Sequence, residues 1–423
     1  MWMNMVIPPL GCEMILWLIE RHDKACGKES RKKMHFWNRI VSRSAIVLPL
    51  SAGSNRFFFA KRKRDRVLFV EINLRTRTKP ERNERMDSVT KKQLTAEEIE
   101  RIAQTTFGCG CKTYEELSEG WANSAYLLAL EDGREAVLKV AADSEEGRMR
   151  CERGLMRTET EVMRRIERSG GVPLPRIYAY DDSKRTIGSE YFLMERVKGE
   201  TYDKARGELA PEIRDAIDGE LGGYFRRIHE IEGREFGYYL PNAANAPLWE
   251  DAFIALMRDV MQDGREAGIE LPMAYEELDA ELERRREALR EVRTPRLVHW
   301  DSWPGNVFVR DGRVEGIIDF ERALWADPLM EHGFGKFWDT DAFERGYAAE
   351  DAALRSAAET DDSARLASLP EGSEASRKIR RALYALYLDL VMRVECHYRG
   401  FGPEHTEWAR QNLQNGWERY SNL

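Results

Sequence analysis

The chain has 423 residues, 42% of them hydrophobic, which is enough for two or three domains with ordinary cores. Its charge is unevenly divided: residues 1–85 carry 19 Lys and Arg against 8 Asp and Glu, and residues 86–423 carry 47 against 66. The six cysteines show neither an even spacing nor a zinc-site spacing, which excludes a small disulfide-stapled secreted domain. We therefore expect a protein of the reducing cytosol.

The first 85 residues differ from the rest of the chain. They hold a short apolar run (Met14–Ile19), an aromatic cluster (Phe57–Phe59) and a basic run (Lys61–Arg64), and none of these predicts a periodic element. No apolar stretch in this segment is long enough to span a bilayer, and the pattern of a signal peptide is missing. The basic run could contact nucleic acid or acidic lipid, but a solvated tail is the commoner explanation. We expect residues 1–85 to be a disordered or non-native extension that precedes a start at Met86, and we expect neither nucleic acid nor a membrane as partner.

A small mixed domain is predicted next. Thr95 and Glu98 form a capping box at the start of a short helix, Ala96–Ile102. Two strands, Ser124–Ala129 and Glu135–Ala141, flank an Asp-Gly pair typical of a hairpin turn.

A long helix is predicted over Ser144–Arg168, with an apolar stripe that includes Leu155 and Val162. Glu159 falls within this stripe, and a carboxylate on a buried face needs a cation. Lys139, near the end of the preceding strand, is the candidate partner. The alternatives are that Glu159 lies at a solvated rim and that Lys139 is an exposed edge residue.

Two further strands, near Ile177–Tyr180 and over Tyr191–Arg196, complete this domain, which we place at residues 86–198. Beyond Gly199 the pattern is mainly helical, and residues 199–423 form the second predicted domain. Its predicted helices are Pro211–Ile231, Trp249–Glu266, Tyr275–Val292, Ser376–Tyr398 and Pro403–Tyr420.

The most informative stretch is Leu297–Glu321, which contains the Asp311-Gly312 pair of a second hairpin. Counting back from this turn, we expect Arg310 to face Arg313, Phe308 to face Glu315, and Asn306 to face Ile317. Val307, Val309, Val314, Gly316 and Ile318 would then form the buried face. Asn306 and Asp319 would share the other face.

Asp301 precedes Asn306 by five residues, on a loop that Pro304 and Gly305 keep from being helical. A carboxylate beside an amide and a second carboxylate is what phosphoryl transfer requires: one group to deprotonate the attacking hydroxyl, and hard oxygen ligands for Mg²⁺. The spacing from His299 to Asp319 matches that of a kinase catalytic loop and its metal-binding aspartate. The alternative is a hairpin with solvated polar residues.

These residues resemble the aminoglycoside phosphotransferase family, small-molecule kinases related to choline and fructosamine kinases. The resemblance implies an α+β, bilobal kinase-like fold with a small β-rich N-lobe and a larger helical C-lobe. It implies that Lys139 grips the ATP phosphates, that Ser124 lies near them, and that Met194, Glu195 and Val197 form the adenine-binding hinge. For this last segment an edge strand and turn is the alternative.

Two residues depart from the expected patterns. Trp300 occupies a position often filled by Gly in the resembled family, and Glu321 stands where protein kinases have Gly. Three others are predicted to be structural: His299 supports the loop, His229 lies in the core, and Asp327 caps a helix before Pro328.

The predicted function is Mg²⁺-dependent transfer of the γ-phosphoryl group of ATP, or of GTP, to a hydroxyl of a small acceptor. Asp301 would be the catalytic base, Asn306 and Asp319 the metal ligands, and Lys139 and Glu159 part of the nucleotide site. The acid excess of residues 86–423 and the resemblance together predict an amine-bearing, cationic acceptor. The alternative is a pseudokinase that serves as a nucleotide-binding module.

Overall fold

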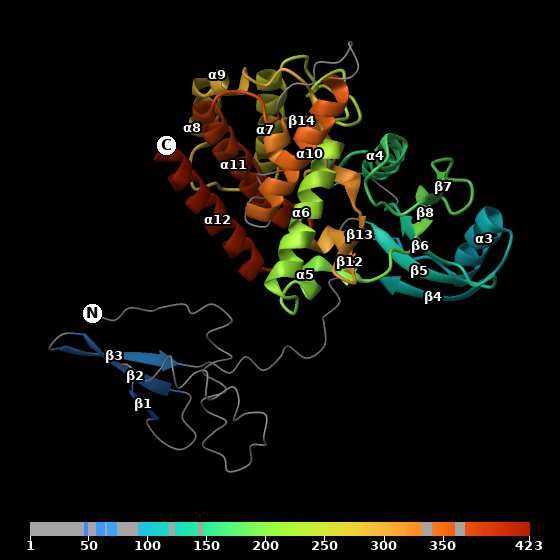
Figure 1. The fold of residues 1–423 in the computed structure, drawn as a ribbon, viewed down its shortest axis with the longest axis horizontal. Helices are drawn as coiled ribbons and strands as arrows, with labels where there is room; N and C mark the ends of the chain where they lie inside the picture. Colours follow the sequence, from blue (N-terminus) through green and yellow to red (C-terminus); the bar gives the residue numbers. More distant parts are fainter. Residues whose placement is uncertain are drawn as a thin grey trace. The chain divides into compact units, whose positions relative to one another are not determined.

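The computed structural model describes residues 92–117, 123–142, 147–331, 341–359 and 369–423, together with three strands that precede them (Figure 1). The chain divides into two compact units, Met1–Met86 and Asp87–Leu423. No helix within the described residues is both long and apolar enough to cross a membrane.

The first unit contains an antiparallel sheet in the order β1–β2–β3, formed by Ile46–Pro49, Arg56–Lys63 and Arg66–Asn73. The sequence predicted no element here. Phe57–Phe59 nevertheless lie in β2, because aromatic and β-branched residues favour strands even where apolar and polar residues do not alternate. That this segment lies outside the native protein stays a prediction.

The second unit contains a five-stranded antiparallel sheet in the order β4–β5–β6–β8–β7. β5 and β6 are joined by the predicted Asp-Gly turn, and β4 was not predicted. The strands are β4 (Cys111–Leu117), β5 (Ser124–Leu130), β6 (Glu135–Val140), β7 (Ile177–Asp181) and β8 (Tyr191–Glu195).

The two faces of this sheet are covered by different helices. On the outer face, α3 (Ala96–Phe107) buries Ile99 and Ile102 against Leu128, Leu138 and Leu193. Thr95 and Glu98 form the predicted capping box at its start. On the inner face, Phe192 and Met194 share a core cluster with Val162 and Met163 of α4 (Leu155–Ser169).

Helix α4 begins later than predicted. The expected start at Ser144 lies outside the described residues, and a short 3₁₀ turn, Arg150–Glu152, precedes the helix. Gly154 then adopts a left-handed conformation (φ 64°), which α-helical geometry does not continue through, so the helix starts at Leu155.

The helical lobe follows β8. Three predicted helices are present with shifts of a few residues, Trp249–Glu266 has the predicted bounds, and the predicted Tyr275–Val292 is two helices divided at Arg285. The short α5 and the long α10 were not predicted. The helices are α5 (Tyr202–Ala205), α6 (Pro211–Ile228), α7 (Trp249–Glu266), α8 (Tyr275–Arg284), α9 (Arg286–Leu289), α10 (Asp341–Glu359), α11 (Glu374–Tyr398) and α12 (Pro403–Ser421).

Two small sheets lie between these helices, in the orders β10–β14–β11 and β13–β12–β9. Short 3₁₀ turns connect them: η2 (Pro304–Asn306), η3 (Phe320–Arg322) and η4 (Pro328–Met330). The strands are β9 (Glu200–Thr201), β10 (Gly237–Tyr238), β11 (Arg296–Val298), β12 (Val307–Arg310), β13 (Arg313–Ile317) and β14 (Leu324–Ala326).

The β12–β13 hairpin has the predicted turn but only part of the predicted register. Asp311 and Gly312 both have positive φ, and Arg310 faces Arg313. A bulge between Phe308 and Val309 then shifts the pairing, so Phe308 faces Gly316 rather than Glu315. Asn306 is correspondingly not paired with Ile317, whose partner is Val307.

The bulge also changes the face on which later residues lie. Ile317, fully buried opposite Val307, belongs to the core, whereas Ile318 is only half-buried. Asp319 follows in a left-handed conformation (φ 70°), so its side-chain direction is set by this kink and not by strand alternation.

Candidate active site

Lys139 connects the two lobes. From β6 its Nζ lies 2.6 Å from Glu159 Oε1 on α4 and 2.9 Å from Asp319 Oδ1 after β13. Glu159 is fully buried, as its place on the apolar stripe required, and its second oxygen has no hydrogen-bond partner among the described residues. The predicted Lys139–Glu159 ion pair is therefore present.

The charge states of Lys139 and Asp319 follow from their surroundings. Burial lowers the pKa of Lys139, but the Asp319 and Glu159 carboxylates outweigh burial and raise the pKa well above its ordinary value. For Asp319 the burial effect is likewise outweighed by Lys139, and its pKa is lowered. Lys139 is thus a permanent cation, and its ammonium group lies beside a group of carboxylates.

The loop that carries Asp301 is fixed from behind by one buried carboxylate. Glu331 accepts hydrogen bonds from the backbone N–H of His299 (2.8 Å) and of Trp300 (2.9 Å). His299 is fully buried, and its Nε2 lies 2.9 Å from the Ile318 carbonyl, which joins the loop to the end of β13. His299 therefore supports the loop, as predicted.

Asn306 lies at the end of the same loop, in η2. Its side-chain Nδ2 donates to the Asp301 carbonyl at 2.8 Å, and its own carbonyl accepts from the Ile318 N–H at 3.0 Å. The amide oxygen of Asn306 remains available for another partner. The predicted set of Asp301, Asn306 and Asp319 is thus held together by backbone contacts across the β12–β13 hairpin.

Asp301 is half-buried beside a cation. Burial raises the pKa of its carboxyl, and the Arg322 guanidinium, which favours the ionised form, offsets this effect only partly. A carboxylate with a raised pKa is a stronger base than an ordinary aspartate, which suits the removal of a proton from a hydroxyl.

Arg322 belongs to a buried ion-pair network that sequence reasoning missed. It pairs with Glu395 of α11 and lies 3.3 Å from Glu152, and Arg399 pairs with the same two carboxylates. The partners are far apart in sequence, so only the fold brings them together.

Glu321 was noted in the sequence as a departure from the protein-kinase pattern, but no role was predicted for it. It is 7% exposed and accepts a hydrogen bond of 3.0 Å from Asn123 Nδ2, which comes from the turn before β5. One oxygen each of Glu159, Asp319 and Glu321 lie within 4.8 Å of one another. Burial and the neighbouring Asp319 raise the pKa of Glu321 to about 8.

The donor chemistry of this region fits a divalent cation. The amide oxygen of Asn306 and the carboxylates of Asp319 and Glu321 are hard oxygen ligands of the kind that Mg²⁺ prefers. The Glu159 and Asp319 carboxylates also outnumber the single Lys139 ammonium, and a bound cation would favour the ionised form of Glu321.

Only some of the residues predicted to bind the nucleotide lie on the same side of the sheet as Lys139. Met194 is 4% exposed on the same sheet face as the neighbour of Lys139, Phe192. The N–H of Glu195 donates to the Arg176 carbonyl at 2.8 Å and is therefore already engaged, and Val197 packs near Gly316.

Ser124 is not brought to this cluster. It pairs with Val140, whereas Lys139 pairs with Ala125, so the side chains of Ser124 and Lys139 lie on opposite faces of the sheet. The Ser124 hydroxyl donates to the Lys92 carbonyl at 2.6 Å and is buried there.

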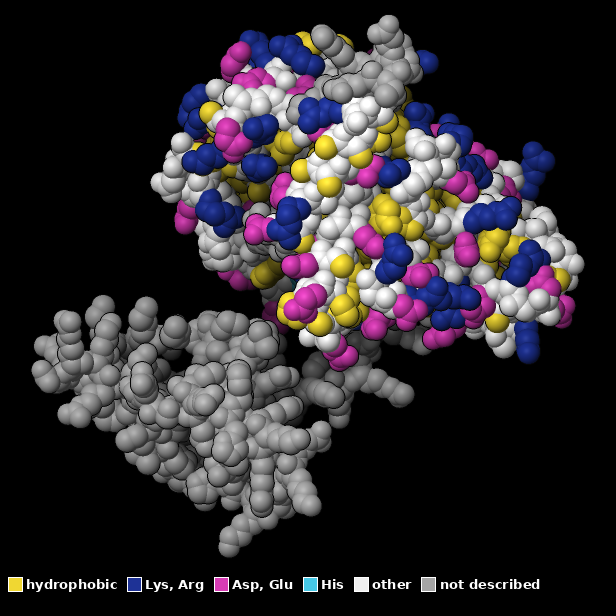
Figure 2. Space-filling view, viewed as in Figure 1, with side chains coloured by type: hydrophobic (Ala, Val, Ile, Leu, Met, Phe, Trp, Pro, Cys, Tyr) yellow, Lys and Arg dark blue, Asp and Glu magenta, His cyan; other side chains and the backbone are white. Residues whose placement is uncertain are grey.

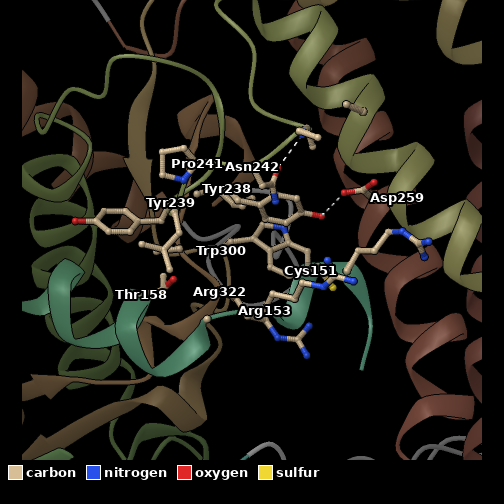
Figure 3. Close-up of a pocket in the computed structure, with 18 of the residues that line it drawn as sticks. Cys151, Arg153, Thr158, Tyr238, Tyr239, Pro241, Asn242, Asp259, Trp300 and Arg322 are labelled. Atoms are coloured by element: carbon tan, nitrogen blue, oxygen red, sulfur yellow. Dashed lines mark hydrogen bonds between the residues drawn. The ribbon is translucent and has the colours of Figure 1, made fainter. Parts of the chain in front are cut away.

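A cavity of about 830 Å³ adjoins the catalytic loop (Figure 3). Trp300, Glu321 and Arg322 form its wall on the catalytic side, and residues of β10, the loop after it, and α7 form the opposite wall. Trp300 is 4% exposed and has a positive φ of 66°, a backbone conformation that glycine adopts more easily.

Comparison with known proteins agrees with this geometry. The sequence pattern of the phosphotransferase enzyme family matches residues 113–369, more than half of the chain. No curated protein sequence matches the chain.

Solved structures with a similar fold cover three quarters of the chain. A thermostable mutant of aminoglycoside phosphotransferase APH(4)-Ia is 18% identical, with 77% of this chain and 100% of that chain covered and a TM-score of 0.50. A putative aminoglycoside phosphotransferase from Ralstonia eutropha is 14% identical, with 78% and 99% covered and a TM-score of 0.51. A putative fructosamine-3-kinase from Thermobifida fusca is 17% identical, with 76% and 98% covered and a TM-score of 0.51.

These likenesses confirm the predicted kinase-like fold, with a β-sheet lobe and a helical lobe. Since the family match covers residues 113–369, more than half of the chain and part of both lobes, the chain belongs to the phosphotransferase enzyme family.

Proposed function

We propose that this protein transfers the γ-phosphoryl group of ATP, or of GTP, to a hydroxyl group of a small, amine-bearing molecule. The observation that carries the proposal is the Lys139 ammonium, which joins Glu159 of the N-lobe to Asp319 of the C-lobe at 2.6 and 2.9 Å beside the Asp301 loop. A cation held at this junction suits the phosphates of a nucleotide bound between the lobes.

The proposed reaction assigns each group one task. The Asp301 carboxylate takes the proton of the acceptor hydroxyl, and the resulting oxygen attacks the γ-phosphorus. A new P–O bond to the acceptor forms as the bond from the γ-phosphorus to the β–γ bridging oxygen breaks, and the nucleoside diphosphate leaves. Lys139, held by Glu159, neutralises charge on the phosphate oxygens.

Asn306 and Asp319 would hold Mg²⁺, and the bound ion would supply positive charge to the β- and γ-phosphates. Asp319 presents one oxygen to Lys139 and keeps the other for a ligand. The backbone groups at Glu195 and Val197 and the side chain of Met194 would receive the adenine. The Ser124 side chain points away, so we propose that any phosphate contact there is made by backbone.

The amine on the proposed acceptor follows from the acid excess of residues 86–423 and from the family resemblance. On the face of the second unit seen in Figure 2, acidic and basic side chains are interspersed, so long-range steering has little support on that face. Any preference for an amine must therefore come from groups close to the acceptor. We further propose that the reaction takes place in the cytosol, where ATP is available.

The test is release of ADP or GDP in the presence of Mg²⁺ and a panel of amino alcohols, amino sugars and glycated amines. We expect acceptor-dependent nucleotide consumption that Asp301→Asn lowers by about 10² to 10⁴ while nucleotide affinity stays nearly unchanged.

The matched control is Asp311→Asn, the same chemical change on the exposed hairpin turn, where positive φ also suits asparagine. Full activity of Asp301→Asn would refute the assigned base. Nucleotide binding without turnover of any acceptor would instead favour a nucleotide-binding module.

A further inference from the structure

The cavity beside the catalytic loop has a charge pattern of its own. Six arginines and four carboxylates line it: Arg150, Arg153, Arg157, Arg258, Arg286, Arg322, Glu190, Asp251, Asp259 and Glu321. Five of these arginines are already paired with carboxylates. Arg150 pairs with Asp263 and Glu266, Arg157 with Glu161, Arg258 with Asp279 and Glu283, Arg286 with Asp251 and Glu283, and Arg322 with Glu152 and Glu395. The wall is therefore close to neutral, with little charge left for a ligand.

Asp259 is the exception on the α7 side of the cavity. It is half-buried, and within the part of the chain that the structure describes it forms no ion pair. Its one hydrogen-bond donor is the Tyr238 hydroxyl at 3.3 Å, and Figure 3 shows this pair at the edge of the cavity. Burial raises the pKa of Asp259, and the nearby Arg150 and Arg153, which favour its ionised form, form no ion pair with it. A half-buried carboxylate of this kind lowers its free energy by binding a cation that enters the cavity.

The other carboxylates of the wall are engaged differently. Glu190 accepts a hydrogen bond from Tyr180, and Glu321 accepts one from Asn123 at the nucleotide end of the site. Arg153, which forms no ion pair with the described residues, is an exposed cation on the same wall. Asp259 is thus the place for one positive charge on this wall, and the exposed Arg153 repels a second.

Aromatic rings form much of the remaining surface. Trp300 lies beside Asp301 in the chain, its ring centroid 5.3 Å from that of Tyr387, and Tyr238 belongs to the same core cluster and also lines the cavity. Trp300 has a positive φ, a backbone conformation that suits glycine. The indole therefore occupies space next to the base that a glycine would leave open. The cavity is thus narrowed and made apolar where the acceptor hydroxyl must arrive.

We infer that this cavity binds an acceptor with a single cationic group, which pairs with Asp259, and a ring or apolar part that lies against Trp300 and Tyr238. The inference rests on the proposed function, because it takes the cavity to be the acceptor site. It distinguishes the acceptor from polycationic sugars, whose further ammonium groups would lie against a nearly neutral wall and the exposed Arg153.

The test measures binding and needs no turnover. Dissociation constants are determined for the full-length protein with 2-amino-1-phenylethanol and with 1-phenylethane-1,2-diol, which differ only by an amine in place of a hydroxyl. Kanamycin serves as the polycation. We expect the amine to bind about tenfold to a hundredfold more tightly than the diol, as for a charge-assisted hydrogen bond, and more tightly than kanamycin.

Three variants separate the role of Asp259 from a general effect on folding. Asp259→Asn should remove the preference for the amine, and Asp259→Glu should restore part of it. Glu266→Gln, a carboxylate-to-amide change on the same helix but outside the cavity, should leave it unchanged.

Equal affinity for the two phenyl compounds, no binding of the amine, tightest binding of kanamycin, or a preference retained by Asp259→Asn would each overturn the inference. Failure of the proposed function shows separately, as a lack of nucleotide consumption with any acceptor while the amine still binds.

Discussion

At the scale of single residues, Glu159 illustrates how a buried charge is tied to function. Its carboxylate is fully buried, and one oxygen contacts only the Lys139 ammonium. Such a pair adds little net stability, because removal of two charges from water costs about as much as their attraction returns. We propose that the pair instead holds Lys139 in place when phosphates compete for it.

We therefore predict that Glu159→Gln raises the KM for ATP about tenfold through loss of a charge-assisted contact. Glu161→Gln is the matched control, since Glu161 lies on the exposed face of the same helix and pairs with Arg157. Steady-state kinetics at saturating acceptor measure both. An unchanged KM in Glu159→Gln would show that Lys139 is positioned without it.

Glu331 offers a second prediction at this scale. Glu331→Ala leaves two buried backbone N–H groups of the catalytic loop without an acceptor, at a cost on the order of 3 kcal/mol, and should lower kcat as the loop loosens. Urea unfolding and kinetics measure the two effects. A variant with full activity and stability would mean that the loop is held by other contacts.

The same residue predicts a pH dependence. Burial would raise the pKa of Glu331, but the hydrogen bond and charge of His229 outweigh burial, and the pKa is lowered from its ordinary value of 4.5. A lowered pKa means that the folded state favours the ionised form, so this stabilisation is present above pH 4.5 and is lost as the pH falls further. Urea unfolding of wild type and Glu331→Gln should therefore converge in acid, whereas a difference that widens there would contradict the assignment.

Sequence patterns predicted some of these residues and missed others for physical reasons. An acid on an apolar helical stripe must find a cation, so Glu159 and Lys139 could be paired in advance. Glu321 and Arg322 gave no such signal, because their partners Asn123, Glu152 and Glu395 are brought near only by the folded chain.

At the scale of elements, the close packing of α6 on α10 is a contact that sequence patterns did not predict. A Cβ on Gly222 would lie 2.1 Å from the Phe343 carbonyl oxygen, and one on Gly346 would lie 2.0 Å from that of Gly219. The two helices thus meet through backbone at small residues. Beside these glycines, Phe343 of α10 packs on Phe225 of α6. Helix α10 was not predicted because its sequence is mainly alanine and charged residues, with few large apolar side chains to show a helical period.

We predict that Gly222→Ala destabilises the protein by about 2 kcal/mol, since the backbone of α10 cannot give way to the added carbon. Gly223→Ala, one position along the same helix, meets its nearest atom only at 3.9 Å and should stabilise by about 0.5–1 kcal/mol through helix propensity. Chemical denaturation compares the pair. Equal changes in the free energy of unfolding would mean that α6 and α10 can move apart without loss of stability.

The β12–β13 hairpin shows a similar limit. Its turn was predictable because Asp-Gly suits positive φ at both positions, and the residues next to the turn pair as expected. The bulge beyond Phe308 could not be predicted from alternation, and it moved Ile317 into the core. Asp319 still reached the site, because its own left-handed backbone turns the side chain toward Lys139.

At the scale of the whole molecule, the chain divides between Met86 and Asp87, where its charge also changes sign. The site described above lies entirely in the second unit. We predict that a protein beginning at Met86 folds and keeps its kcat and KM, as measured by circular dichroism and nucleotide consumption. An insoluble or inactive product would mean that the first unit is part of the native fold.

The Arg322 network has a consequence for how the protein is made. Glu152 lies 170 residues before Arg322, and Glu395 lies 73 residues after it, in the penultimate helix. A ribosome that has just released Asp301 has therefore not yet synthesised the carboxylate that secures the neighbouring guanidinium. The nascent chain completes the catalytic segment only when α11 emerges, so we predict that premature termination before that helix yields a protein that cannot consume ATP.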